Sequence, residues 1–440
     1  MNDKLSQILL LIDEYITDKN ASAKWEAGKD WVQYSGPVFN SKEYIAAVES
    51  LLGGWLVLGK DAITFESKFP KLLGKEYGIL TNSGSSSNLI MVSALKSKRA
   101  FKFKEGDKVI TPIAGFPTTL NPIIQNNLKP LFVDIELDTL NLDLDQVEQR
   151  AKEGAKAIAF AHVLGNSTDM SRLMSIVEKY KLVLLEDCCD ALGSTYDSKP
   201  LGSFGDMASC SFYPAHHITM GEGGFVACKD KNLEVVTRSF REWGRGCFCV
   251  GKKANLLKNG SCGNRFSNWL EAFPDKIFDH KYIYDEIGYN LKPIEMQASI
   301  GLCQLDKLDE ITLRRNENYA KLFSIFEEYE EHFILPRPRA KVKPSWFAFP
   351  LTIKNNAPFD RFAFCNYLED HKIQTRTYFG GNLGLQPAYS GMISRQEALS
   401  YKNATKATVD TFFLGTSPVI TECQIQYVKS VVNKFFKEKV

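Results

Sequence analysis

The stretch TNSGSSSN, residues 81–88, follows an apolar run at 77–80 and leads into a helix-forming run at 89–95. Small residues at such a turn let backbone N–H groups approach a phosphate, and the N-terminus of the helix adds a favourable dipole. A serine-rich helix cap is the alternative interpretation. The stretch therefore predicts a strand, a turn and a helix, and leaves the phosphate site open.

Further short apolar runs alternate with helical patterns across about residues 76–230. They lie at 77–80, 108–110, 130–133, 157–161, 182–185, 208–212 and 225–228. Runs of this length between helical segments predict βα units and a largely parallel sheet. Ligands gather at the carboxyl ends of such strands, so the polar residues found there are the candidate site residues.

Composition and charge narrow the class of protein. The 440 residues include 54 Lys and Arg against 52 Asp and Glu, which gives no charge excess for a nucleic acid or an anionic membrane. Residues 5–16 have amphipathic helical spacing, but Asp13 and Glu14 interrupt their apolar run. Since no segment sustains about 18 apolar residues, we expect no membrane span and a cytoplasmic protein.

Changes in pattern predict three parts. An N-terminal helical segment covers residues 1–60, and a large α/β domain covers 61–320 with a cysteine-containing insertion at 243–289. Prolines at 336, 338 and 344 break the helical pattern before a small domain, residues 321–440.

Two strand ends carry candidate chemistry. The strand at 182–185 runs into EDCCD, residues 186–190, where an acid can cap a helix, bind a metal or pair with a pyridine nitrogen. The next strand ends in SFYPAHHIT, residues 211–219, followed by the glycine-rich 221–224. A lone histidine is usually structural, but the adjacent His216 and His217 in a polar, glycine-flanked strand exit favour a functional role.

In their order, these segments resemble the fold-type-I pyridoxal-phosphate enzymes, and among them the DegT/DnrJ/EryC1/StrS-type sugar aminotransferases and sugar 3-dehydratases. The resemblance covers nearly the whole chain. It is carried by GGW at 53–55, Gly59, Phe65-Glu66, SGS at 83–85, GFPTT at 115–119, HVLGN at 162–166, Glu186-Asp187, Ser211-Phe212, GEGG at 221–224 and GYN at 288–290. It implies an aspartate aminotransferase-like α/β fold with a large, mostly parallel seven-stranded sheet domain and a smaller C-terminal α+β domain.

The same resemblance assigns a cofactor, pyridoxal or pyridoxamine 5′-phosphate, to the strand ends. Gly84, Ser85 and Ser211 would hold its phosphate. Phe116 would stack on the ring, and Asp187 would pair with the ring nitrogen.

Further positions follow from the family pattern for subunits and substrate. Asn290 would reach the phosphate of a neighbouring subunit, which implies a homodimer. The substrate pocket would draw on four residues of the C-terminal part, Trp346, Phe347, Arg376 and Asn382.

One departure from the family pattern decides the expected reaction. Aminotransferases of the family place a Schiff-base lysine five residues after the serine of the Ser-Phe pair, and His216 stands there. Without that amine the usual nitrogen transfer is lost, whereas an imidazole still moves protons. The substitution resembles the branch that deoxygenates C3 of nucleotide-linked 4-keto-6-deoxyhexoses, in which Tyr213 and Asp190 would separate dehydration from transamination. His217 is either a packed neighbour or a substrate contact.

Four cysteines resemble the cluster ligands of the iron–sulfur members acting on CDP-linked sugars. Cys189, Cys247, Cys249 and Cys262 share their order, although the gap from Cys249 to Cys262 is longer than in those members. The expected function is C3 deoxygenation with pyridoxamine phosphate, a [2Fe–2S] cluster and an NADH-dependent flavin or iron–sulfur reductase, in lipopolysaccharide O-antigen synthesis. Scattered free thiols are the alternative.

Three other functions remain open. A cluster-free, glutamate-using GDP-4-keto-6-deoxymannose 3-dehydratase is disfavoured by the four cysteines, and a plain aminotransferase by the missing lysine. A non-catalytic regulator or scaffold of the same fold would be expected to lose the phosphate cradle and the ring acid, yet both are present. The sequence fixes neither the nucleotide nor the sugar epimer.

Overall fold

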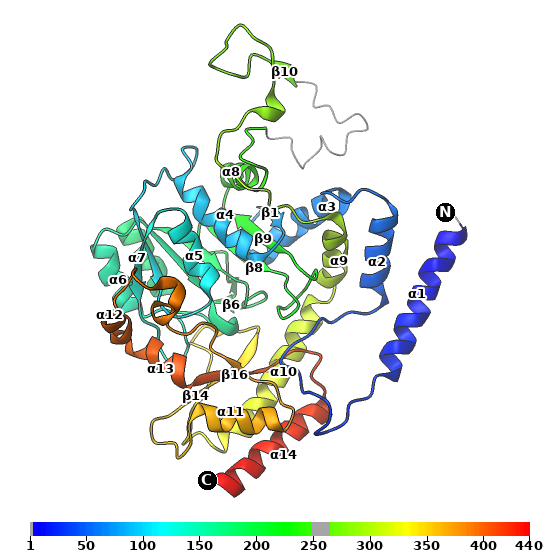
Figure 1. The fold of residues 1–440 in the computed structure, drawn as a ribbon, viewed down its shortest axis with the longest axis vertical. Helices are drawn as coiled ribbons and strands as arrows, with labels where there is room; N and C mark the ends of the chain where they lie inside the picture. The colour runs from blue at the N-terminus through cyan, green and yellow to red at the C-terminus, as the bar shows by residue number, and fades with distance from the viewer. Residues whose placement is uncertain (1–2, 248–264) are drawn as a thin grey trace.

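The computed structural model describes residues 3–247 and 265–440 and has a seven-stranded sheet at its centre (Figure 1). Its strands, in spatial order, are β1 (Tyr77–Thr81), β9 (Gly224–Cys228), β8 (Met207–Ser211), β5 (Val183–Asp187), β4 (Ala157–Ala161), β2 (Lys108–Pro112) and β3 (Lys129–Val133). Within this sheet β9 runs antiparallel to both of its neighbours, and the remaining pairs are parallel. The predicted large, mostly parallel sheet is confirmed.

The strands are apolar on both faces because helices cover both sides. Successive residues point to opposite faces, so Ile79 packs with Ile90 and Ile123, whereas Leu80 joins the cluster of Phe65 and Phe69. The covering helices are α3 (Lys60–Lys68), α4 (Gly84–Lys96), α5 (Pro117–Gln125), α6 (Leu144–Lys152), α7 (Met170–Tyr180), α8 (Lys231–Arg241) and α9 (Glu295–Leu305).

The small domain is built on an antiparallel four-stranded sheet at the opposite end of the molecule from β10 (Figure 1). Its strands are β12 (Phe333–Ile334), β14 (Ala348–Ile353), β16 (Thr411–Gly415) and β15 (Arg376–Thr377). Its helices are α11 (Arg361–Asp370), α12 (Arg395–Ser400), α13 (Lys402–Asp410) and α14 (Glu422–Lys439).

Helix α10 (Leu308–Glu327) links the two domains. Its first turns supply Leu308 and Ile311 to the core of the large domain, and its last turns supply Ile325 and Phe326 to the core of the small domain. The predicted boundary near residue 320 therefore falls inside one continuous helix.

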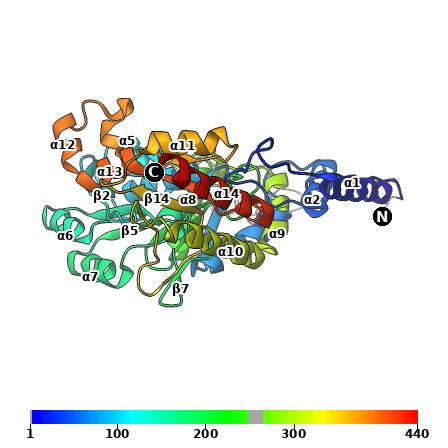
Figure 2. The same ribbon diagram turned by 90° about the horizontal axis from the view of Figure 1, so that it is seen from below.

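The N-terminal part confirms the expected helix and adds an unexpected connection. Helix α1 (Asp3–Ser22) extends away from the body in both views (Figures 1 and 2), and α2 (Ser41–Leu52) follows it. Between them, Val32 forms a bridge with Ile373 and is buried in the core of the small domain. Across residues 3–247 and 265–440, the helices are all too short or too polar to cross a membrane.

Two smaller sheets complete the fold. One joins β13 (Val342–Lys343), β6 (Thr195–Tyr196) and β7 (Lys199–Pro200). The other is a hairpin of β10 (Phe266–Ser267) and β11 (Phe278–Asp279) in the predicted insertion, which projects from the body beyond α8 (Figure 1).

Candidate active site

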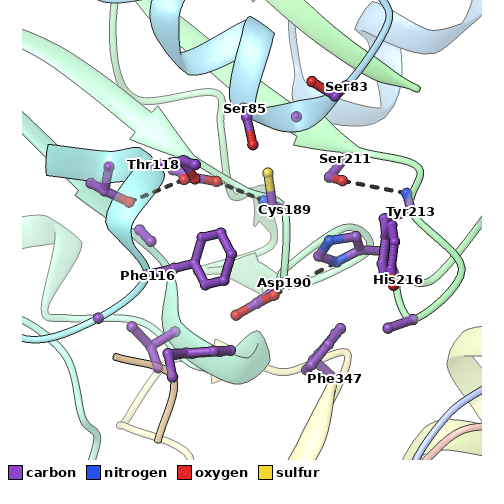
Figure 3. Close-up of a pocket in the computed structure, with 18 of the residues that line it drawn as sticks. Ser83, Ser85, Phe116, Thr118, Cys189, Asp190, Ser211, Tyr213, His216 and Phe347 are labelled. Atoms are coloured by element: carbon purple, nitrogen blue, oxygen red, sulfur yellow. Dashed lines mark hydrogen bonds and ion pairs between the residues drawn. The ribbon is translucent and has the colours of Figure 1, made fainter. Parts of the chain in front are cut away.

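A pocket of about 780 Å³ opens at the carboxyl ends of the parallel strands, as expected for an open α/β sheet. Its wall above the sheet is the turn from β1 to α4 (Figure 3). Ser83 caps α4 by accepting a hydrogen bond from the backbone N–H of Ser86, at 3.1 Å. The first turn of the helix, with its unpaired N–H groups and positive dipole end, is thereby directed at the pocket.

Close packing explains why glycine begins this helix. A Cβ atom at Gly84 would lie 2.5 Å from Cβ of Ser211 and 3.1 Å from Sγ of Cys189. The missing side chain leaves room beside the hydroxyls of Ser85 and Ser211, which also line the pocket. Hydroxyls and free N–H groups at a helix N-terminus suit a phosphate, so this cradle fits the phosphate of the expected cofactor.

Asp187, the last residue of β5, is held by three donors at the floor of the pocket. Its Oδ2 accepts hydrogen bonds from Nδ2 of Asn88 at 2.7 Å and Oγ1 of Thr119 at 3.3 Å. Its Oδ1 accepts one from the backbone N–H of Cys189 at 3.0 Å. Ser209 donates to the other end of the Asn88 amide, which fixes its orientation. The carboxylate is therefore oriented in advance, as pairing with a ring nitrogen requires.

His216 and Asp190 meet on the next wall of the pocket (Figure 3). Nδ1 of His216 lies 3.6 Å from Oδ1 of Asp190, and the imidazole is tilted against the ring of Phe347. Both side chains are largely buried. Tyr213 lies beside them and is half exposed to the pocket.

Burial sets the charge of this pair. Desolvation lowers the pKa of His216 to about 4, against an opposing contribution from the Asp187 charge. Desolvation, followed by the like charge of Asp187, raises the pKa of Asp190 to about 7. Near neutral pH the imidazole is therefore uncharged and able to accept a proton, while Asp190 is close to half-protonated.

Most of the predicted site residues gather in this one pocket. The residues that line it are Gly84, Ser85, Phe116, Asp187, Cys189, Asp190, Ser211, Tyr213, His216, Phe347 and Arg376. Phe116 packs edge-on against Phe379 and leaves half of its surface exposed toward the pocket. The structure thus assembles the cofactor cradle, the acid and the histidine from separate strand ends.

Three residues predicted as substrate contacts have buried side chains that contact other residues of the protein instead. Nε2 of His217 lies 3.0 Å from the carbonyl oxygen of Ser345. Trp346 stacks on Tyr319 at 4.2 Å between ring centroids. The amide of Asn382 donates to the carbonyl of Ala398, and all three of these predicted residues are buried. The structure places them outside the pocket lining.

Asn290 also lies away from the pocket of its own chain. It forms an isolated bridge with Glu242, and its Oδ1 accepts a hydrogen bond from Nζ of Lys292 at 2.6 Å. This position leaves the predicted role toward a second subunit as a proposal.

The predicted cluster ligands are only partly described. Cys189 lines the pocket, and Cys247 is buried at the root of the insertion, with its sulfur 3.5 Å from Nε2 of His280. Cys249 and Cys262 lie outside the described residues. Cys247 does not line the pocket that contains Cys189. The described residues therefore do not place the two cysteines in one site.

Sequence reasoning missed the residues that support the site. Asn88 and Thr119 hold Asp187, and Tyr34, from the segment between α1 and α2, lines the pocket with Arg376 of β15. The guanidinium of Arg376 lies over the Tyr34 ring at 4.3 Å. The available signal was Asn88 directly before the apolar run at 89–92, because a buried amide needs polar partners.

Comparison with known proteins places the chain in one family. The model of the DegT/DnrJ/EryC1/StrS aminotransferase family matches residues 39–433. The lipopolysaccharide biosynthesis protein RfbH of Salmonella typhimurium is 41% identical, over 99% of this chain and 98% of its own length. The dTDP-4-dehydro-2,6-dideoxy-D-glucose 3-dehydratase of Saccharopolyspora spinosa is 38% identical, over 98% of this chain and 92% of its own.

A solved structure extends the likeness to three dimensions. It is an E. coli GDP-4-keto-6-deoxy-D-mannose-3-dehydratase with bound hydrated pyridoxal phosphate, with a TM-score of 0.77 and 25% identity over 91% of this chain and 99% of that one. With the pocket geometry and the match over residues 39–433, this shows that the chain belongs to the DegT/DnrJ/EryC1/StrS aminotransferase family.

Proposed function

We propose that the chain is a B6-dependent 3-dehydratase that removes the C3 hydroxyl of a nucleotide-linked 4-keto-6-deoxyhexose. The observation that carries the proposal is the neutral His216 beside Asp190 in the cofactor pocket, at the family's lysine position. Among the described residues that line this pocket none is a lysine. The names of two relatives, both 3-dehydratases of nucleotide-linked sugars, support the same reaction class.

The pocket fits pyridoxal or pyridoxamine phosphate. Gly84, Ser85 and Ser211 would hold the phosphate, Asp187 the ring nitrogen and Phe116 a face of the ring. When bound, the pyridoxamine form supplies an amine for the C4 ketone and an electron sink for bond breaking at C3.

Side chains of the protein would carry out the proton transfers. The uncharged imidazole of His216 would accept a proton from C4′ of the cofactor, and Asp190 would orient the imidazolium that results. The phenol of Tyr213, half exposed beside His216, would donate to the departing C3 hydroxyl. Because His216 cannot form a Schiff base, cofactor and protein would stay noncovalently associated.

The nucleotide would bind at the outer end of the pocket. Arg376 is exposed there, and its contact with Tyr34 combines a cation with an aromatic face, which suits a diphosphate beside a base or sugar. We propose CDP as the nucleotide from the family resemblance. Since the relatives above include dTDP- and GDP-linked substrates in their names, the three nucleotides must be compared directly.

Net reduction at C3 consumes two electrons, which we propose reach the site through a [2Fe–2S] cluster from an NADH-dependent flavin or iron–sulfur reductase. Support for the cluster is the family-like order of the four cysteines. The described residues do not complete a cluster site, because Cys249 and Cys262 lie outside them.

A homodimer is the proposed assembly. Exposed apolar side chains are frequent on the projecting insertion, including Phe266, Phe273 and Ile277, and large exposed apolar surfaces mark protein contacts. Sedimentation of the protein with and without cofactor, and of Asn290→Ala, tests both the dimer and the contribution of Asn290 to cofactor affinity.

One anaerobic experiment tests the function. Protein with pyridoxamine phosphate and a CDP-, dTDP- or GDP-linked 4-keto-6-deoxyhexose is assayed with reductase and NADH, with glutamate alone, or with neither. We expect a 3-deoxy sugar only with reductase and NADH. Repeated turnover with glutamate alone would place the protein in the cluster-free branch, and an amino sugar would make it an aminotransferase.

Two serine variants separate the cluster from general damage. Cys247→Ser should abolish iron–sulfur absorption and product formation, whereas Cys423→Ser, at an exposed thiol of the small domain, should change neither. Full reductive turnover by Cys247→Ser would remove Cys247 from the proposed ligands.

A further inference from the structure

Arg315 is a buried cation directly behind the catalytic wall of the pocket. It lies on α10, and only 1% of its surface is exposed. Its Nη2 donates to the carbonyl oxygens of Ala215 at 3.0 Å and His216 at 3.1 Å. Its Nη1 donates to the carbonyl oxygen of Phe347 at 2.8 Å.

The partners of this guanidinium are unusual for a buried charge. Within residues 3–247 and 265–440, no carboxylate comes within 4.0 Å of Arg315 to form an ion pair. Burial lowers its pKa to about 10, with Asp190 acting in the opposite direction. Burying a charge without an adjacent counter-charge is costly, so three main-chain acceptors must provide its local compensation.

Those acceptors belong to two different parts of the fold. Ala215 and His216 lie on the loop after β8 of the large domain, whereas Phe347 immediately precedes β14 of the small domain. A planar guanidinium with donors in a fixed fork holds such acceptors in a defined relative position. The imidazole of His216 and the ring of Phe347 lie 5.3 Å apart at the same junction.

Neighbouring contacts act on the same two segments. Asn316, the next residue of α10, donates to the carbonyl of Pro344 and accepts from the N–H of Trp346. Ser35 donates to the carbonyl of Ala215. Of Ser35, Arg315 and Asn316, it is Arg315 that bonds both to the loop that carries His216 and to the residue that precedes β14.

We propose that Arg315 is a positioning residue that fixes the backbone of His216 against the small domain, so that the imidazole faces the cofactor at the correct distance. The inference rests on the proposed function, because it assigns His216 as the base. A misplacement of about 1 Å in a reacting group costs on the order of 100-fold in rate.

The test compares two variants of Arg315 with a matched neighbour. Arg315→Met keeps the length of the side chain but removes its donors, and Arg315→Lys keeps the charge but cannot present a fork to both segments. Arg314→Met, at an exposed position paired with Glu317, is the control on the same helix. The first measurement is hydrogen–deuterium exchange of peptides covering 212–218 and 361–370 in protein without cofactor.

The second measurement is the rate of solvent exchange of the C4′ proton of pyridoxamine phosphate in the presence of sugar substrate. For Arg315→Met we expect at least about 10-fold faster deuterium uptake at 212–218 with no change at 361–370, and about 100-fold slower C4′ exchange, expressed in kcat with little change in KM. Arg315→Lys should show the same pattern with a smaller change, and Arg314→Met should match the wild type.

The outcomes distinguish this inference from the proposed function. Unchanged deuterium uptake at 212–218 and unchanged C4′ exchange in Arg315→Met would overturn the positioning role. If Arg315→Met does not fold, Arg315→Lys decides in the same way, because wild-type values for both measurements would overturn it. Absence of C4′ exchange in the wild type would instead refute the proposed function. In that case, unchanged deuterium uptake at 212–218 in Arg315→Met would still refute the positioning role of Arg315.

Discussion

The buried pair of His216 and Asp190 should make the stability of the protein respond to acid in opposite directions when either member is removed. The pKa of His216 falls from 6.5 to about 4 on folding, so its contribution to stability is complete above pH 6.5 and is lost as the pH falls toward 4. The pKa of Asp190 rises from 3.8 to about 7, so its contribution is complete below pH 3.8 and is lost as the pH rises through 7.

The magnitudes follow from the two pKa changes. At about 1.36 kcal/mol per pKa unit, acidification from pH 7.5 to 4.5 costs about 2.5 kcal/mol through His216 and returns about 3 kcal/mol through Asp190. These contributions nearly cancel in the wild type. His216→Asn should therefore gain about 2.5 kcal/mol on acidification relative to the wild type, and Asp190→Asn should lose about 3 kcal/mol.

Urea unfolding of the protein without cofactor at both pH values measures this directly. Every other titrating group is shared, so each variant is compared with the wild type over the same interval. Parallel pH dependence in all three proteins would show that the two side chains are not desolvated as the structure indicates, and a reversed order would refute the assignment of charge.

Three further predictions concern the cofactor. Borohydride should fix pyridoxal phosphate covalently to His216→Lys but not to the wild type, as mass spectrometry will show, and labelling of any wild-type pocket lysine would contradict the assigned position. Asp187→Asn should lower turnover by on the order of 100-fold or more while the unfolding midpoint stays near that of the wild type, so near-normal turnover would remove the ring-nitrogen role. Gly84→Ala should weaken cofactor binding by about 10-fold or more in fluorescence titration, since the added methyl meets Ser211 at 2.5 Å, and unchanged affinity would argue against the cradle.

Much of the fold could be predicted because its signals are local. Several central strands are short, mainly apolar and buried runs, such as Ala157–Ala161, and β1, β2, β3 and β9 are each followed directly by an α-helix. Other features depend on distant partners. The bridge from Val32 to Ile373 and the passage of α10 through both cores have no signature in the intervening sequence.

The site was predictable where the chemistry dictates the residue type. Gly84, Asp187 and His216 follow strand ends in a family order, and the structure brings them into one pocket. Supporting residues were missed because the sequence does not show which acceptor a buried donor meets, as with Arg315. The family pattern assigns both Trp346 and Phe347 to the substrate pocket, yet neighbouring residues at the start of a strand point to opposite sides, and only Phe347 lines the pocket.

Exchange of the C4′ proton of pyridoxamine phosphate in D₂O, with a nucleotide-linked 4-keto-6-deoxyhexose present, tests most directly whether His216 is the base of a 3-dehydratase. Wild-type protein should exchange this proton without reductant, and His216→Asn should bind the cofactor with similar affinity yet exchange at least about 100-fold more slowly. Exchange at the wild-type rate in His216→Asn would contradict the central claim.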